Sequence, residues 1–300
     1  DKFHVIKMAN EQMDSARKYF YKYAPHGLKK SKSLFLMCED APERKAIRLI
    51  NPINEDLSLM RTTLVPSMLN AISRNQKKGN LEGRLFEIAK IFIPKELPLT
   101  DYPDERDTLC VGVFGQNEDF FTLKGIAETV ADTFLLDFEY EEAEKSFLHP
   151  YQTAVIKCEG EEIGYLGKLA YDIADKLDLR NDAYVMQIDL AKLAKWNDKK
   201  AVFKPLPKFA EESRDLALVM TKDITCKQVE DVIGQSCNYI KNIRLFDVYE
   251  GAGIADDKKS MAFTVEFCPK DEAFESDSVD HFVNKILKNL KKELDIDLRS

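Results

Sequence analysis

The sequence lacks the cysteine and histidine patterns that bind metal ions. Its six cysteines lie far apart with no C-x-x-C pair, and its four histidines include no H-E-x-x-H motif. These absences argue against the common zinc sites, and we expect no metal site in the chain. Isolated cysteines are typical of reduced, mostly buried thiols, which predicts a cytoplasmic protein.

Long apolar runs are missing as well. No segment approaches the ~18 to 20 apolar residues that a membrane span needs. The N-terminus also lacks the short basic and then apolar pattern of a secretion signal. We therefore expect a soluble chain with no membrane contact. Because the sequence begins with Asp1 rather than with Met, we expect it to be a piece of a longer protein.

An excess of positive charge is also absent. Lys and Arg number 44 against 52 Asp and Glu, which gives a net charge of -8. From Lys208 to Ser300 there are 14 basic and 19 acidic residues, a net charge of -5. Nonspecific binding to nucleic acid needs clustered cations. Any RNA contact in this segment must therefore depend on shape, stacking and a few local cations.

The length of 300 residues and the hydrophobic content of 44% are sufficient for two domains with ordinary cores. Pro205 and Pro207 interrupt the pattern of strands and helices. We place the domain boundary there, between residues 1–204 and residues 205–300.

The first domain is predicted to be a mixed domain with a mostly antiparallel sheet. Residues 154–158 and 162–167 read as a hairpin around a Glu159-Gly160 turn. Other strands are expected at residues 47–51, 85–92, 108–115 and 184–188, and helices at 10–23, from Pro66 onward and at 123–136.

The second domain reads as strand, helix, strand, strand, helix, strand. This order is typical of a ferredoxin-like unit, whose helices cover one face of the sheet and leave the other available for a ligand. Thr225 and Gln228 have the spacing of a capping box at the start of the first helix. The second helix is expected to start near Ser276 or Asp277.

Strand alternation predicts which side chains lie on the open face. An apolar row from Met261 to Phe267 forms the core side of one strand, so Ser260 lies on the other side. On the preceding strand, Asp247 and Tyr249 share a side, which places all three together. Leu245 has the same parity as Asp247, so either the face is partly covered there or a β-bulge shifts the register.

These three side chains suit one unstacked base. The ring of Tyr249 offers a stacking platform, and the carboxylate of Asp247 and the hydroxyl of Ser260 can read the edges of the base. Stacking of this kind contributes roughly 1 to 3 kcal/mol per base. The alternative is structural: Tyr249 caps the sheet, and Asp247 pairs with a neighbouring cation.

Residues 214–220, residues 246–249, Gly251, Gly253 and residues 259–260 closely resemble the anticodon-binding module of the bacterial phenylalanyl-tRNA synthetase beta subunit. Lys208-Phe209 stands where that family has a similar basic-aromatic pair. In the family, the residues equivalent to Asp247, Tyr249 and Ser260 meet the first anticodon base. The resemblance therefore implies that these three residues bind the anticodon.

The preceding part resembles the catalytic-like domain of the same subunit, which is a class II synthetase core by fold. Residues 1–45 carry little of this resemblance. The matching segments are Asn51-Pro52, residues 60–66, residues 84–88, His149-Pro150 and residues 163–167.

The arginine motif with which class II enzymes grip ATP, G-x-G-x-G-x-x-R, is absent. Cationic side chains are needed there to neutralise charge in the transition state. We therefore assign no catalytic residue and expect the chain alone not to activate phenylalanine. Arg61 and Arg84 are interpreted as members of internal ion pairs, with contact to a partner subunit as the alternative.

The resemblance implies an α+β chain, with a class II synthetase-like antiparallel-sheet domain followed by a ferredoxin-like βαββαβ domain. The implied function is a noncatalytic part of phenylalanine-tRNA ligase. The implied partners are the alpha subunit, in an alpha2beta2 tetramer, and tRNA(Phe). ATP and Mg2+ would serve the whole enzyme, with no cofactor bound by this chain.

The sequence is also compatible with two other functions. One is a free-standing RNA- or protein-binding module with no role in aminoacylation. The other is an autonomous class II synthetase-like enzyme, which amino-acid-dependent pyrophosphate exchange by the chain alone would establish.

Overall fold

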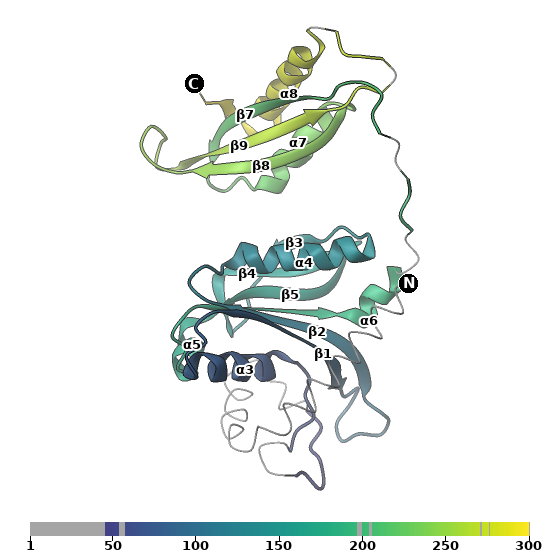
Figure 1. Cartoon of the computed structure of the whole chain (residues 1–300), viewed down its shortest axis with the longest axis vertical. Helices are drawn as coiled ribbons and strands as arrows, with labels where there is room; N and C mark the ends of the chain where they lie inside the picture. Colours follow the sequence, from purple (N-terminus) through teal and green to yellow (C-terminus); the bar gives the residue numbers. More distant parts are fainter. Residues whose placement is uncertain are drawn as a thin grey trace. The chain divides into compact units, whose positions relative to one another are not determined.

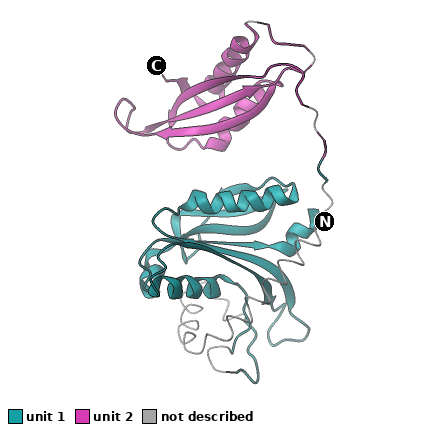
Figure 2. Ribbon diagram, viewed as in Figure 1, with its two compact units in different colours: residues 1–201 teal, residues 202–300 magenta. Residues whose placement is uncertain are grey.

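The computed structural model describes residues 46–53, 58–196, 200–203, 206–270, 272–275 and 277–299. The chain divides into two compact units, residues 1–201 and residues 202–300 (Figure 2). The boundary expected from the sequence lies between residues 204 and 205. The helix expected over residues 10–23 lies outside the described residues.

Unit 1 is built on a six-stranded antiparallel sheet with the order β1-β2-β6-β5-β4-β3 (Figure 1). Its strands are β1 (Gly83–Ile93), β2 (Asp104–Phe114), β3 (Glu139–Glu142), β4 (Leu148–Cys158), β5 (Glu161–Leu169) and β6 (Ala183–Asp189). Its helices are α3 (Val65–Lys77), α4 (Phe120–Phe134), α5 (Tyr171–Lys176) and α6 (Leu190–Leu193), followed by a 3-10 turn (Ala194–Trp196).

Both faces of this sheet are covered by apolar cores. Along β2, Leu109, Val111 and Val113 belong to the core under α4, whereas Cys110 and Phe114 belong to the core under α3. Successive strand side chains point to opposite faces, so an unbroken apolar strand can serve two cores at once. Figure 1 shows α3 and α4 on opposite sides of the sheet.

The hairpin of β4 and β5 has the predicted turn. Glu159 and Gly160 both have positive φ, 50° and 77°. This is the backbone required at the two central residues of a type I′ turn, whose twist matches that of the flanking strands. The helix expected from Pro66 is α3, which begins at Val65.

The strand expected at residues 47–51 is wrong in extent. The described residues there form a single bridge, between Arg48 and Leu59. Pro52 follows directly, and proline has no N–H to donate to a ladder. Helix α5 and the short strand β3 were not expected from the sequence and appear in the structure.

Unit 2 has the βαββαβ order and the strand order β10-β7-β9-β8. Its elements are β7 (Glu212–Thr221), α7 (Cys226–Ser236), β8 (Ile240–Tyr249), β9 (Lys258–Phe267), α8 (Ser278–Leu294) and β10 (Asp297–Leu298). Every neighbouring pair is antiparallel. Val229 of α7 and Ile286 of α8 pack into one core with Phe263 of β9, so both helices cover the same face. The α+β class and the ferredoxin-like arrangement are confirmed.

Local signals set the ends of the two helices of unit 2. The Thr225 N–H donates to Gln228 Oε1 (2.8 Å), and the Gln228 N–H donates to Thr225 Oγ1 (3.3 Å). The predicted capping box is therefore confirmed. Helix α8 begins at Ser278 after the N-cap residue Asp277, as expected.

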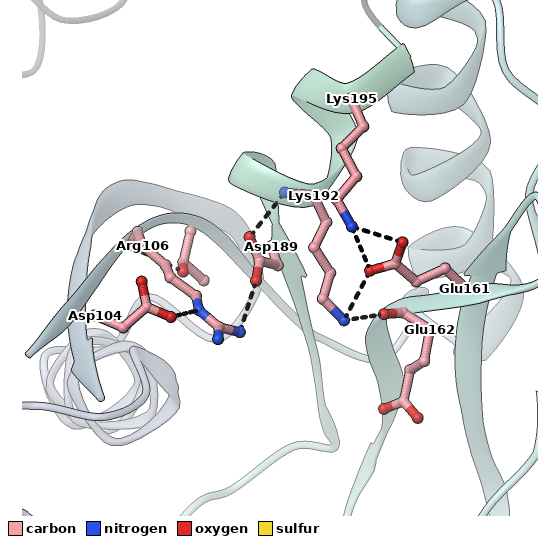
Figure 3. A network of polar contacts seen from close by, with 8 residues as sticks. Asp104, Arg106, Glu161, Glu162, Asp189, Lys192 and Lys195 are labelled. Atoms are coloured by element: carbon pink, nitrogen blue, oxygen red, sulfur yellow. Dashed lines mark hydrogen bonds and ion pairs between the residues drawn. The ribbon is translucent and has the colours of Figure 1, made fainter. Parts of the chain in front are cut away.

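A polar network holds the last helix of unit 1 (Figure 3). Asp189 Oδ1 accepts from the Lys192 N–H (3.1 Å) at the start of α6, and Asp189 Oδ2 accepts from Arg106 Nη1 (3.2 Å). Lys195 Nζ lies 2.7 Å from Glu161 Oε2, and this hydrogen bond keeps the pKa of the Glu161 carboxyl below its usual value. The network ties α6 to strands β2 and β5.

None of the described helices is long and apolar enough to span a membrane.

Candidate nucleic-acid interface

The candidate interface is the face of the unit 2 sheet that lies opposite α7 and α8. On β9, Met261 and Phe263 point into the core and are at most 6% exposed. Alternation then directs Ser260, Ala262 and Thr264 to the other face. No described helix packs on that side.

A β-bulge in β8 decides which of its side chains reach this face. Leu245 is opposite Phe263, Asp247 is opposite Ala262 and Tyr249 is opposite Ser260, with the register shift between Leu245 and Asp247. Opposed residues of an antiparallel pair point to the same side of the sheet. Simple alternation would place Leu245 and Asp247 on the same face, and the bulge explains why they lie on opposite faces. The structure brings Asp247, Tyr249 and Ser260 together on one face.

Small side chains form the floor between the strands. Ser260 lies between Val219 on β7 and Tyr249 on β8. The next row contains Ala217, Ala262 and Asp247. Because Ala, Val and Ser side chains are small, they leave room above the sheet, between the larger side chains at its edges, for a planar base.

Tyr249 spans part of this floor. Its hydroxyl donates to the carbonyl oxygen of Ala252 (3.1 Å), in the turn after β8. The guanidinium carbon of Arg299 lies 5.0 Å from the centre of the Tyr249 ring, a cation–π distance. The N–H of Arg299 donates to the carbonyl oxygen of Ala217 (2.8 Å), which places Arg299 at the β10 edge.

The contact between Arg299 and Tyr249 crosses the sheet. Their strands are separated by β7 and β9, a lateral distance of roughly 14 Å at about 4.8 Å per strand spacing. The two long side chains can meet only by lying over the strands between them. This arrangement accounts for the low exposure of Ser260, which is 3%.

Asp247 is exposed and has no described Lys or Arg nitrogen within 4.0 Å. The described residues thus offer no ion pair of the kind that a purely structural Asp247 would make. An exposed carboxylate beside an aromatic ring is free to accept hydrogen bonds from the N–H groups of a base.

The sequence does not predict the position of Arg299 beside Tyr249. Its place beside Tyr249 depends on β10, an edge strand of two residues that carries no alternation of its own. The only available signal was a cation close after the second helix.

The two arginines singled out in unit 1 are held by internal ion pairs. Arg61 Nη1 lies 3.0 Å from Glu87 Oε1, and Arg84 Nε lies 2.9 Å from Glu118 Oε1. The hydrogen bond to Glu118 raises the pKa of Arg84. The ion-pair interpretation is confirmed for both. The described residues contain no group of three or more His, Cys, Asp or Glu side chains that could hold a metal ion.

Comparison with known families accounts for both units. Residues 26–190 match the family described as the phenylalanyl tRNA synthetase beta chain CLM domain, and residues 207–299 match the ferredoxin-fold anticodon binding domain. The chain belongs to the phenylalanyl-tRNA synthetase beta chain family. The resemblance identified in the sequence is thereby confirmed.

Curated relatives carry the name phenylalanine–tRNA ligase beta subunit. Those of Clostridium acetobutylicum and Clostridium tetani are each 33% identical over 267 residues, covering 88% of this chain and 34% of the relative. That of Listeria innocua is 32% identical and covers 84% of this chain and 33% of the relative. The chain spans about a third of the length of these beta subunits.

A solved pyrrolysyl-tRNA synthetase from Desulfitobacterium hafniense aligns with a TM-score of 0.44 at 15% identity, covering 57% of this chain and 60% of that one. This similarity is too low to support an argument, and the assignment depends on the family matches.

Proposed function

We propose that the chain is a noncatalytic part of a cytoplasmic phenylalanine-tRNA ligase. It supports the catalytic alpha subunit in an alpha2beta2 tetramer and binds the anticodon of tRNA(Phe) during ATP-dependent aminoacylation. The observation that supports this function best is the open face of unit 2, where the ring of Tyr249 lies beside the carboxylate of Asp247, which has no ion pair with a described residue.

In this proposal one anticodon base stacks on the ring of Tyr249 while Asp247 accepts hydrogen bonds from its edge. Ser260 offers its hydroxyl, but at 3% exposure it is reached only when the side chains above it move. Entry of the base therefore requires Arg299 to move from its place over the ring. The freed guanidinium is planar and can stack on a base or bind a phosphate.

Unit 1 has features that argue against catalysis by this chain. Apolar cores cover both faces of its sheet. Arg84 forms an ion pair with Glu118 within the chain. We therefore assign amino-acid activation, with its ATP and Mg2+, to the alpha subunit and propose no cofactor for this chain.

The test is to express the chain together with a phenylalanyl-tRNA synthetase alpha subunit and to measure complex formation and charging of tRNA(Phe). We expect a complex, and we expect weaker tRNA binding when the first anticodon base is replaced. The proposal is wrong if neither this chain nor a full-length relative binds the alpha subunit. RNA binding without that complex would favour a free-standing RNA-binding module.

A further inference from the structure

A second row of polar side chains lies on the same open face. Arg244 on β8 is opposite Thr264 on β9, and Thr264 is opposite Asp215 on β7. Thr264 lies two residues along β9 from Ala262, so it points to the same side. This row is therefore next to the row that contains Asp247.

Arg244 has no described ionic partner, whereas several other cations of unit 2 are paired. Arg214, Lys222 and Lys241 each lie within 3.2 Å of a carboxylate oxygen. Arg244 is exposed, and no described Asp or Glu oxygen lies within 4.0 Å of its guanidinium nitrogens. Its charge is therefore available to an anion from outside the unit.

The other two residues of the row present acceptors. Thr264 Oγ1 donates to Asp215 Oδ1 (2.7 Å), which fixes the direction of the hydroxyl. The lone pairs of Thr264 Oγ1 and the second oxygen of Asp215 are not used by this bond. Acceptors of this kind suit the amino and imino N–H groups on the edge of a base.

The spacing of the two rows suits a single strand of RNA. Two residues along a β-strand advance roughly 7 Å. An unstacked RNA strand advances by a comparable distance for each nucleotide. Two neighbouring nucleotides can therefore occupy the two rows without a change in the path of the strand.

We propose that Arg244, Thr264 and Asp215 form a second nucleotide subsite for single-stranded RNA, beside the subsite at Tyr249. Arg244 binds the phosphate that joins the two nucleotides, and Thr264 and Asp215 accept hydrogen bonds from the second base. This inference rests on the proposed anticodon-binding function and extends it to a neighbouring nucleotide.

A phosphate is the ligand that fits Arg244 best. The guanidinium fork can form two parallel hydrogen bonds to phosphate oxygens. In a segment, residues 208–300, with a net charge of -5, RNA affinity depends on a few such local contacts. Each phosphate neutralised on a single strand adds about 0.7 to the slope of log K against log salt concentration.

The experiment measures the affinity of the whole chain for a tRNA(Phe) transcript between about 50 and 200 mM salt. The variants are Arg244→Gln and, as a matched control, Lys288→Gln. Lys288 is exposed on α8, which packs on the opposite face of the sheet, and no described carboxylate lies within 4.0 Å of its Nζ.

We expect Arg244→Gln to weaken binding about fivefold to tenfold at the lowest salt concentration and to reduce the salt slope by about 0.7. Lys288→Gln should leave the affinity and the slope unchanged. A loss of affinity with an unchanged slope would overturn the phosphate contact, and an unchanged affinity would overturn the subsite.

Tyr249→Ala separates this inference from the proposed function. If Tyr249→Ala weakens binding and Arg244→Gln does not, the second subsite is wrong and anticodon binding stands. If the wild-type chain does not bind tRNA(Phe), or if Tyr249→Ala binds as well as wild type, the anticodon-binding function fails and the second subsite fails with it.

Discussion

Replacement of Tyr249 tests the candidate interface most directly. Tyr249→Ala removes the ring and with it the surface on which a base would stack, a loss of roughly 1 to 3 kcal/mol in RNA binding. The expected result is about a fivefold to 150-fold weaker affinity for tRNA(Phe). Activation of phenylalanine by a complex with the alpha subunit should be unaffected.

The same substitution also lowers the stability of unit 2. It removes the hydrogen bond to Ala252, which contributes about 0.5 to 1.5 kcal/mol, and the cation–π contact with Arg299, which contributes about 0.5 to 1 kcal/mol. We therefore expect a decrease of about 1 to 2.5 kcal/mol in the free energy of unfolding. A loss of this size leaves an ordinary domain folded.

Tyr249→Phe is the matched control, because it keeps the ring and removes only the hydroxyl. Its stability should fall by about 1 kcal/mol, while its affinity for tRNA(Phe) stays within about twofold of wild type. The assay is a tRNA titration and a thermal melt of all three proteins. Equal losses of affinity in Tyr249→Phe and Tyr249→Ala would refute the stacking argument, because the ring would then not be the group that matters.

Four further results are expected. Gly164→Ala should lower the free energy of unfolding, measured with urea, by at least about 2 kcal/mol, because the new β-carbon would lie 2.2 Å from the Gln187 carbonyl oxygen. Gly125→Ala in α4 has open space around it and should raise the free energy of unfolding by up to about 1 kcal/mol. Thr225→Ala should lower the free energy of unfolding by about 0.5 to 2 kcal/mol through loss of the capping box. The chain alone, given ATP and phenylalanine, should form no aminoacyl-adenylate above background, and robust pyrophosphate exchange would contradict this. Burial raises the pKa of the Cys110 thiol, so at mildly alkaline pH it should resist alkylation in the native protein and react after denaturation.

Features set by neighbouring residues could be predicted from the sequence. The capping box of Thr225 and Gln228 and the Glu159-Gly160 turn involve residues at most three positions apart. The core side of β9 followed from its alternation. In each case the physical cause lies within one element or one turn, so the sequence contains it in full.

Features set by distant partners could not be predicted in the same way. The parity conflict in β8 indicated a bulge as one of two explanations, but its position depends on the pairing with β9. The contact of Arg299 with Tyr249 depends on the two-residue strand β10 and on two side chains that extend over the strands β7 and β9. Among the described residues, the expected strand at residues 47–51 is reduced to one bridge, between Arg48 and Leu59.

The edges of the unit 2 sheet have a consequence for solubility. An open sheet offers the unpaired N–H and C=O groups of its edge strands to other chains, which can add a strand there and begin aggregation. Here β8 forms one edge and is interrupted by two register shifts, between Ile240 and Asn242 and between Leu245 and Asp247. The other edge, β10, has two residues. Neither β8 nor β10 is itself a long regular template, so a strand added along either of them would be short or interrupted.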